Sequence, residues 1–319
     1  MNSMHHSLSL RPLFMSAFTL MALALVQPGN AQVVSNLVYQ YDNVGAAATS
    51  WASSGGSNSP VRDWTIGGTS VDVTLDNSPA TSTTISSAFN FPGNGSENAN
   101  LPKFRGTVGS FSGLGANSTF EIWVRPSALM TGGDMPELIF ETGGWGRGMS
   151  ISFWNDNTIH LAAKDTGTVD TDANIVLVSD ALSASDVTDF IQIVAVMSDT
   201  ASGFALYVNP VSSADPDTPD DTLVKIGSDW VGTDGAGLGG IENQLGGGAN
   251  GGGGGATYFN GAFRTFDGEI GLMRFYDASL TGADVETNFL SVVPEPASGA
   301  LLAVGGLFLL ARRRRAATR

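Results

Sequence analysis

The sequence predicts an all-β protein built as an antiparallel β-sandwich, a jelly roll, and three features support that prediction. Between residues 32 and 291, short runs alternate apolar with polar side chains, which is the period of a strand with one buried face. Turn-forming residues separate the runs, and the chain holds 41 Gly and 13 Pro. Helical spacing is almost absent. Since a sandwich can run to roughly 200–250 residues as one domain, we expect residues 32–291 to form a single domain.

The clearest strand pattern lies in Phe120–Arg125. Its even-numbered apolar residues share one face, and Glu121, Trp123 and Arg125 share the other. The strand should end at Pro126, which cannot donate to a sheet ladder. In chain order, the expected strands are Leu37–Tyr41, Val71–Leu75, Phe120–Arg125, Leu138–Phe140, Met149–Phe153, Ile191–Met197, Phe204–Val208 and Ile270–Tyr276.

One helix and two long loops are expected among these strands. The helix is Ser279–Phe289, with Thr281 as its N-cap, because a Thr hydroxyl can accept a backbone N–H of the first turn. The glycine-rich run Gly246–Gly255 is interpreted as a loop inside the sandwich, since the segment after it holds too few strands to fold alone. The second loop, Ser212–Asp221, is acidic.

The N-terminus has the pattern of a secretory signal peptide. An apolar run over residues 12–26 follows Arg11, and the small residues Gly29 and Ala31 indicate cleavage between Ala31 and Gln32. Residues 1–31 would then be removed. The alternatives are an uncleaved anchor or a buried helix, and the run is shorter than the ~20 residues that span a bilayer.

The C-terminus, residues 292–319, combines three parts. Val293-Pro294-Glu295-Pro296 precedes the apolar run Gly299–Ala311, and four arginines follow. An apolar helix ending in arginines halts an exported chain with the positive charges in the cytoplasm, and its shortness suits transient association with the inner membrane. The four arginines are Arg312, Arg313, Arg314 and Arg315.

This tripartite tail resembles the PEP-CTERM sorting signal of Gram-negative bacteria. The resemblance implies an exosortase-type sorting machinery as partner, removal of the tail, and delivery to the cell surface, outer envelope or extracellular matrix. The alternative is a simple tail anchor.

Composition excludes several classes of protein. The chain has no Cys, which rules out a disulfide scaffold, a zinc ribbon, an iron–sulfur protein and a thiol nucleophile. His160 is the only His between residues 32 and 291, so a multi-His metal site is excluded there. The formal net charge of −15 opposes binding to nucleic acid.

Several sequence segments between residues 32 and 291 resemble the laminin-G-like, concanavalin A-like jelly roll. They are Asn90–Gly95, Phe120–Pro126, Ile139–Gly144 followed by Met149–Ile151, Leu206–Asn209, and Phe266–Tyr276. Pro210 stands where that family usually has Gly, and Glu121 lies one place earlier than its usual Glu. The resemblance implies a module that binds carbohydrate or surface proteins, on a fold that also carries glycoside hydrolases.

No arrangement of residues predicts catalysis. The related hydrolases need acidic residues spaced along one strand face as nucleophile, helper and acid/base, and none of the Glu residues has that spacing; Glu141 is expected at a turn. No Gly-x-Ser-x-Gly motif is present, and His160 lacks motif partners. We therefore expect a non-enzymatic protein, the alternatives being a carbohydrate-active enzyme with unrecognised residues or a purely structural matrix protein.

Aromatic residues predicted to face away from the core are candidates for ligand binding, because a flat ring stacks on the apolar face of a sugar. The alternative for each is packing within the protein. No cofactor is expected except a structural Ca²⁺, which oxygen ligands in acidic loops would hold; the alternative is a solvated loop. The aromatic candidates are Trp123, Trp145, Trp154 and Tyr207, and the calcium candidates are Asp165, Asp170 and Asp172, or Asp215, Asp217, Asp220 and Asp221.

Overall fold

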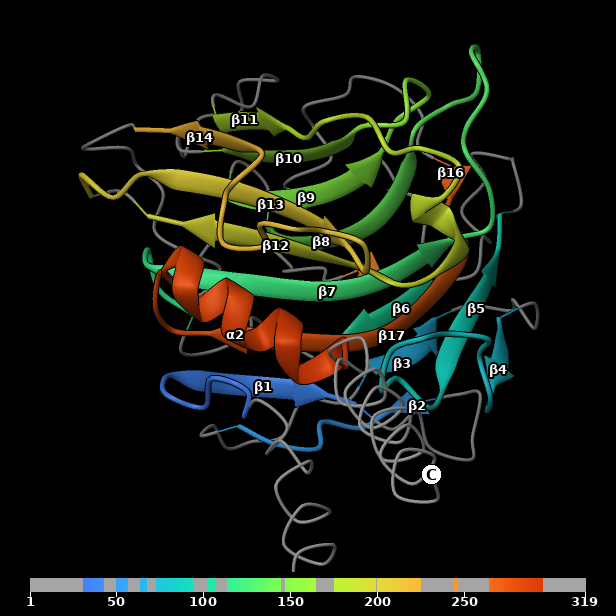
Figure 1. Cartoon of the computed structure of the whole chain (residues 1–319), viewed down its shortest axis with the longest axis horizontal. Helices are drawn as coiled ribbons and strands as arrows, with labels where there is room; N and C mark the ends of the chain where they lie inside the picture. The colour runs from blue at the N-terminus through green and yellow to red at the C-terminus, as the bar shows by residue number, and fades with distance from the viewer. Residues whose placement is uncertain are drawn as a thin grey trace, which may run out of the picture. The chain divides into compact units, whose positions relative to one another are not determined.

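Two stacked, mainly antiparallel sheets form the described part of the protein in a computed structural model (Figure 1). Residues Gln32–Val293 make up one compact unit. The structure describes residues 31–42, 50–56, 64–67, 73–93, 103–106, 114–144, 147–164, 175–198, 200–224, 244–245 and 264–294.

The first sheet has the strand order β14-β13-β12-β7-β17-β5-β4, and β1 also pairs with β17. Its long central strands β7 and β17 come from distant parts of the chain and pair antiparallel. The strands are β1 (Leu37–Tyr41), β4 (Thr74–Asp76), β5 (Ala88–Pro92), β7 (Ser118–Pro126), β12 (Ile191–Met197), β13 (Phe204–Pro210), β14 (Asp221–Leu223) and β17 (Asp267–Tyr276).

The second sheet has the order β11-β10-β9-β8-β15-β6-β3-β2, and β16 pairs with β8 in parallel. A short 3₁₀ helix, η1 (Asp186–Thr188), precedes β12. The strands are β2 (Ser50–Trp51), β3 (Trp64–Gly67), β6 (Lys103–Gly106), β8 (Glu137–Gly144), β9 (Arg147–Phe153), β10 (Ile159–Lys164), β11 (Ile175–Val178), β15 (Gln244–Leu245) and β16 (Arg264–Thr265).

The main hydrophobic core lies between the two sheets. Phe120, Ile122 and Val124 of β7 are fully buried in it, as their alternation predicts. Phe120 also packs on Phe275 of β17 and on Phe140 of β8, with ring centroids 5.2 and 5.8 Å apart. This cluster joins the two sheets, because Phe140 belongs to the second sheet and the other two rings to the first.

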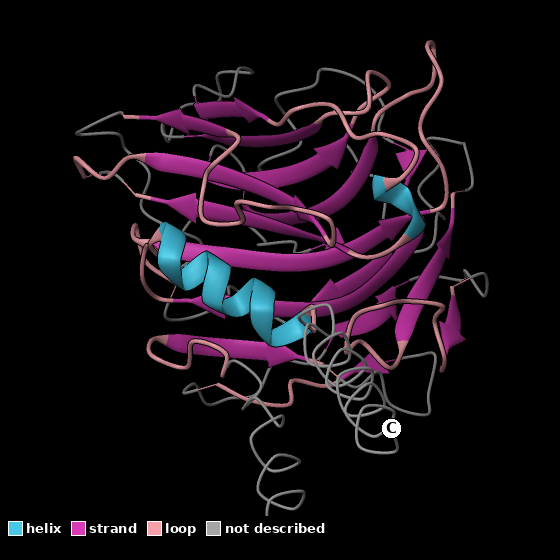
Figure 2. Cartoon of the chain, in the orientation of Figure 1, coloured by secondary structure: helices cyan, strands magenta, loops and turns pink. Residues whose placement is uncertain are grey.

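One α-helix occurs among the described residues, α2 (Gly282–Val292), and it lies across part of the outer face of the first sheet (Figure 2). Thr281 caps it as predicted: its hydroxyl accepts the backbone N–H of Asp284, whose carboxylate accepts the backbone N–H of Thr281. The helix turns one side to the sheet, because its buried residues recur at helical spacing. These residues are Val285, Asn288, Phe289 and Val292.

The predicted fold class is confirmed, and most of the predicted strands are present, several with extended ends. The prediction that Glu141 lies at a turn is wrong: β8 continues to Gly144, and Glu141 is fully buried within it. The strand expected over Val71–Leu75 is observed as Thr74–Asp76. The helix ends at Val292, beyond the expected Phe289. The glycine-rich run Gly246–Gly255 lies outside the described residues.

Candidate ligand-binding surface

The turn between β9 and β10 is held in one geometry by local hydrogen bonds. The backbone N–H of Trp154 donates to the carbonyl of Thr158 (2.9 Å), and that of Asn157 donates to the carbonyl of Trp154 (2.8 Å). Asn157 has a φ of +67°, a left-handed conformation that Asn tolerates better than most residues. Its side-chain oxygen also accepts the backbone N–H of Met130 (2.8 Å). The turn therefore holds Trp154 in a defined position.

Trp154 stacks on His160 from the neighbouring strand. The ring centroids are 4.4 Å apart, and the ring planes differ by 15°. The indole N–H donates to the hydroxyl of Ser152 (3.0 Å), which lies opposite His160 in the β9–β10 register. Since Ile151 and Leu161 of these strands point into the core, Ser152 and His160 lie on the outer face of the second sheet.

A chain of hydrogen bonds fixes the polar side of this stack. Thr158 Oγ1 donates to Asp156 Oδ1 (2.6 Å), so it accepts the proton of His160 Nε2 (2.9 Å). Thr158 lies between the other two groups, unlike a nucleophilic triad, where His bonds both Asp and the nucleophile. We call Ser152, Trp154, Asp156, Thr158 and His160 the Trp154 platform.

The protonation states of the platform follow from its surroundings. Burial lowers the pKa of His160, although the nearby Asp156 carboxylate opposes the shift. Burial would raise the pKa of Asp156, but hydrogen bonds from the side chain and backbone of Thr158 outweigh it and lower this pKa. Near neutral pH the platform therefore carries a neutral imidazole and a charged carboxylate, with Trp154 and His160 partly exposed and Asp156 exposed.

Charged groups border the platform. Asn155 Nδ2 donates to the carbonyl of Asp134 (3.1 Å), and Asp134 also lies 3.6 Å from the guanidinium of Arg264. Arg264 Nε donates to Glu137 Oε1 (2.9 Å), and Arg264 Nη2 lies 2.7 Å from the same oxygen. Burial raises the pKa of Glu137 to about 7, against the lowering effects of the Asp267 backbone N–H and of Arg264.

Two of the predicted ligand-binding residues are buried instead. Trp123 is on the outer face of the first sheet, as predicted, but α2 covers it, and its ring stacks on Phe289 at 5.9 Å. Tyr207 is 6% exposed and packs with Val285 of the same helix. For both, burial fits the alternative of packing within the protein, because neither presents a ring to a ligand. Trp145 lies outside the described residues.

A buried polar network, not predicted from the sequence, lies beneath α2. Glu121 Oε1 accepts from Trp123 Nε1 (2.8 Å), Gln192 Nε2 (3.0 Å) and Arg274 Nη1 (3.3 Å). Its other oxygen accepts from Asn288 Nδ2 of α2 (2.8 Å). The alternation of β7 placed Glu121 beside Trp123, but a local pattern cannot show that a helix distant in sequence will cover both.

Two carboxylates of the acidic loop Ser212–Asp221, both among the calcium candidates, accept backbone N–H groups. Asp220 Oδ2 accepts the backbone N–H of Val208 (2.6 Å), and Asp221 Oδ2 accepts that of Val178 (3.0 Å). These carboxylates hold separate strands, and no group of three or more potential metal ligands occurs among the described residues. The other calcium candidates, Asp165, Asp170 and Asp172, lie outside those residues.

Both ends of the compact unit are tied to its body. The backbone N–H of Val33, next to Gln32, donates to Asn288 Oδ1 (2.9 Å). Val292 and Val293 are 2% and 9% exposed, and the carbonyl of Val292 accepts the backbone N–H of Thr84 (2.8 Å). Pro294 is exposed.

The rest of the predicted sorting signal, Glu295, Pro296 and Arg312–Arg315, lies outside the described residues, as does most of the predicted signal peptide. Within the described part of the chain, no helix has both the length and the apolar character needed to cross a bilayer.

Comparison with protein families identifies a PEP-CTERM protein-sorting motif over residues 292–315. The predicted sorting signal is therefore confirmed as this motif. A search of curated proteins finds no match.

Solved structures share the fold at low identity. The binding domain of botulinum neurotoxin DC in complex with SialylT matches with a TM-score of 0.52 and 11% identity, and that in complex with rat synaptotagmin II with 0.51 and 12%. Both matches cover 80% of this chain and 51% of the other, so the chain spans about half the length of these structures. Trypanosoma rangeli sialidase in complex with sialic acid matches with a TM-score of 0.50 and 12% identity, over 87% of this chain and 38% of the sialidase. These likenesses confirm the β-sandwich, and the narrower laminin-G resemblance stays a prediction.

Proposed function

We propose that this is an exported surface or matrix protein whose sandwich binds polysaccharide through the Trp154 platform without cleaving it. The observation that carries the proposal is the stack of Trp154 on His160, partly exposed on the outer face of the second sheet. Its β9–β10 turn is fixed before any ligand arrives, which limits the entropy lost on binding.

The platform has the two kinds of group that a sugar requires. The exposed part of the indole offers an apolar surface to the C–H face of a sugar ring. The Asp156 carboxylate at its edge accepts hydrogen bonds from hydroxyl groups, and charge-assisted bonds of this kind are stronger than neutral ones. One such platform binds a single sugar weakly, so useful affinity comes from a polymer that engages many copies at once.

The sorting motif supports the proposed location. A PEP-CTERM motif implies export that depends on an exosortase, and we propose the cell surface or extracellular matrix as the destination. The neurotoxin binding domain in complex with SialylT and the sialidase in complex with sialic acid share this fold over 51% and 38% of their own lengths.

The absence of hydrolysis is part of the proposal. Glu121 is engaged by four donors beneath α2, and Glu137 is held by Arg264 and the backbone N–H of Asp267. Both carboxylates thus have structural partners, whereas a glycosidase needs a pair of carboxyl groups facing its substrate.

The test is a panel of bacterial and algal polysaccharides against the full chain purified in mild detergent, with and without Ca²⁺. Trp154→Ala should weaken binding at least about tenfold, or about 1.4 kcal/mol, within the range of an aromatic contact. Trp154→Phe should retain part of the affinity. Val224→Ala is the matched control, since Val224 is an apolar residue 60% exposed outside the platform.

Three outcomes would contradict the proposal. If Trp154→Ala binds polysaccharide as well as the wild type does, the platform is not part of the binding site. New reducing ends in the same wells would indicate a carbohydrate-active enzyme. No binding to any polysaccharide would favour a structural matrix protein with protein partners.

A further inference from the structure

The Trp154 platform has an exposed carboxylate at its edge. Asp156 Oδ1 accepts from the backbone N–H and from the hydroxyl of Thr158, at 3.2 and 2.6 Å. These bonds use only one of its two oxygens, and the residue is exposed. Although burial would raise the pKa of Asp156, the bonds from Thr158 lower it, so the group stays charged in mildly acidic solution. A ligand on Trp154 therefore lies beside a negative charge that can still accept a partner.

Two further carboxylates border the β9–β10 turn that carries the platform. Asp134 lies next to the turn, because its carbonyl accepts from Asn155 Nδ2 (3.1 Å). Asp180 is exposed and belongs to a segment bonded to the same turn, in which the backbone N–H of Leu182 donates to the carbonyl of Asn157 (2.8 Å). Like charges gathered around one site add up to a negative potential there.

The positive charges of the described side chains are already compensated. The structure describes the side chains of three basic residues, and each lies within ion-pair distance of a carboxylate. When Glu137 holds its proton, Asp134 remains 3.6 Å from the guanidinium of Arg264. Since the whole chain carries a net charge of −15, it repels an acidic polymer and attracts a cationic one. The ion pairs are Arg125 with Glu269 (2.6 Å), Arg264 with Glu137 (2.7 Å) and Arg274 with Glu121 (3.3 Å).

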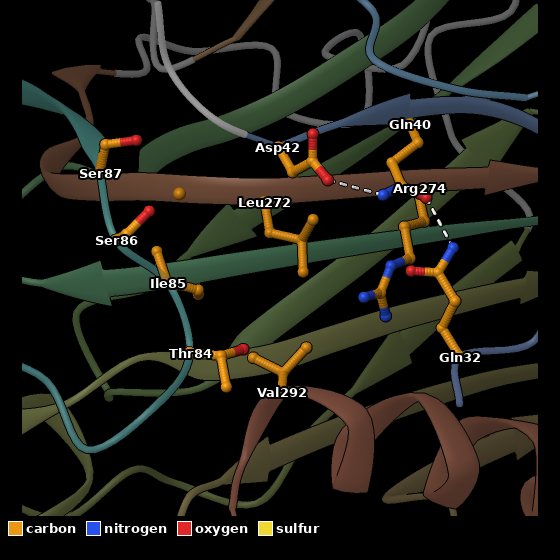
Figure 3. Close-up of a pocket in the computed structure, with 11 residues that line it drawn as sticks. Gln32, Gln40, Asp42, Thr84, Ile85, Ser86, Ser87, Leu272, Arg274 and Val292 are labelled. Atoms are coloured by element: carbon orange, nitrogen blue, oxygen red, sulfur yellow. Dashed lines mark hydrogen bonds between the residues drawn. The ribbon is translucent and has the colours of Figure 1, made fainter. Parts of the chain in front are cut away.

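A cavity on the outer face of the first sheet lacks these features (Figure 3). It has a volume of about 150 Å³, and Arg274, which lines it, would repel a cation. Figure 3 shows that its carboxylate, Asp42, is held by Gln40 (2.7 Å), which is in turn held by Gln32 (2.6 Å). No aromatic side chain occurs among its described lining residues. The platform is therefore the better place for a cationic ligand.

A protonated amino group suits the platform better than a hydroxyl group does. The face of an indole attracts cations, and Trp does so more strongly than Tyr or Phe. His160 does not oppose this attraction, because burial lowers its pKa and favours the neutral ring. The Asp156 carboxylate would receive a charge-assisted hydrogen bond from the ammonium group, which is stronger than one from a neutral hydroxyl.

We propose that the Trp154 platform selects polysaccharides whose sugars carry free amino groups, over neutral and acidic polysaccharides. The sugar ring lies on the exposed part of the indole, and its ammonium group pairs with the Asp156 carboxylate. This inference rests on the function proposed above, because it names the class of ligand for the same site.

The test compares oligomers of glucosamine and of N-acetylglucosamine of equal length, because acetylation removes the positive charge and keeps the ring. Calorimetry on the full chain in mild detergent, at about pH 6, measures Kd for each while the amines are charged. At about 0.01 M salt the glucosamine oligomer should bind at least about threefold more tightly, since a cation–π contact and an exposed ion pair each contribute modestly. The difference should shrink at about 1 M salt.

Two variants assign the preference to the platform. Asp156→Asn keeps an oxygen that can accept from Thr158 and removes the charge, so it should weaken binding of the glucosamine oligomer more than that of the acetylated oligomer. Asp217→Asn is the matched control, because Asp217 is an exposed carboxylate near Tyr207, on the other sheet, and the preference should stay unchanged. Trp154→Ala should weaken binding of both oligomers.

The outcomes separate this inference from the function on which it rests. Equal or tighter binding of the acetylated oligomer, lost in Trp154→Ala, would overturn the preference for amino groups and leave the proposed function standing. A preference for glucosamine that survives Asp156→Asn would overturn the inference, as would binding of the glucosamine oligomer that survives Trp154→Ala, since the net charge of the chain would then suffice. Failure of both oligomers to bind would overturn it as well, and the polysaccharide panel then decides the proposed function.

Discussion

Glu121 and Arg274 form an ion pair in which both side chains are almost inaccessible to water, at 0% and 6% exposure. Removing a charge from water is costly, and here the cost is offset by the pairing and by three further hydrogen bonds to Glu121. Removing only one partner of such a pair leaves an uncompensated buried charge. The folded state is then less stable than one in which neither charge is present.

Arg274→Met should therefore destabilise the protein by about 3–5 kcal/mol. Adding Glu121→Gln should restore part of the loss, because a neutral amide needs no counter-charge while its oxygen still accepts a hydrogen bond. Urea unfolding of the single and double variants measures both effects. A double variant less stable than Arg274→Met would show that hydrogen bonding, and not charge, dominates at Glu121.

Glu137 makes stability depend on pH. Its folded-state pKa of about 7 lies above the ordinary value of 4.5, chiefly because of burial. The folded state thus holds this proton more tightly than the unfolded state does. The resulting stabilisation is fully present below pH 4.5 and is lost as the pH rises through about 7.

We expect Glu137→Gln to remove this contribution, which amounts to at most about 3 kcal/mol by linkage. The free energy of unfolding is measured at acidic and at slightly alkaline pH. The difference between the two values should be smaller in the variant than in the wild type. The same pH slope in both proteins would place the titrating group elsewhere.

At the scale of elements, α2 closes the outer face of the first sheet and carries the polypeptide to the sorting motif. Phe289, Val292 and Val293 share a buried cluster with Trp123 and Leu272. The family match begins at Val292, so the first two residues of the motif belong to the packed body.

Truncation should reveal this boundary. A chain that ends at Val293 should be as stable as the longer protein, whereas one that ends at Leu290 should lose about 3–5 kcal/mol, since burial of each valine contributes about 1.5–3 kcal/mol. Thermal and urea unfolding of the two chains gives the comparison. Equal stabilities would mean that Val292 and Val293 contribute nothing to the fold.

The faces of β7 were predictable from sequence, but their surroundings were not. Alternation assigned Phe120, Ile122 and Val124 to one side and Trp123 to the other, both in agreement with the structure. The expected helix ended at Phe289, so the prediction missed Val292. This residue extends the apolar stripe of α2 over Trp123. Coverage of a sheet by a helix depends on contacts far apart in sequence, which a local period does not contain.

The Trp154 platform was likewise predictable only in part from the sequence. Trp154 was a candidate because it was predicted to face away from the core, whereas no partner was predicted for His160. Their stacking depends on the β9–β10 register, which pairs His160 with Ser152. That register follows from the turn at Asn157, whose left-handed conformation the sequence leaves open.

At the scale of the whole molecule, the net charge of −15 shapes which polymers can approach. Repulsion of an acidic polysaccharide is screened by salt, and the Debye length falls from about 30 Å at 0.01 M to about 3 Å at 1 M. Neutral polymers feel no such repulsion.

Binding to a neutral polysaccharide should thus change less than about twofold between about 0.01 M and about 1 M salt. Pull-down of the full chain on the insoluble polymer at the two salt concentrations measures this. A steep loss of binding at high salt would mean that salt-screened electrostatic contacts, and not stacking on Trp154, hold the polymer.

The burial of Val293 also decides how the protein responds to force. While the protein is held by its C-terminal end, drag from flow or from a bound polymer enters the sandwich at this residue. The load falls first on the contacts of Val292 and Val293 and on the bond from Thr84 to Val292, so α2 peels from its last turn. The rest of the sandwich is held by the ladders of two sheets, so we expect the last turn of α2 to be the element that yields first.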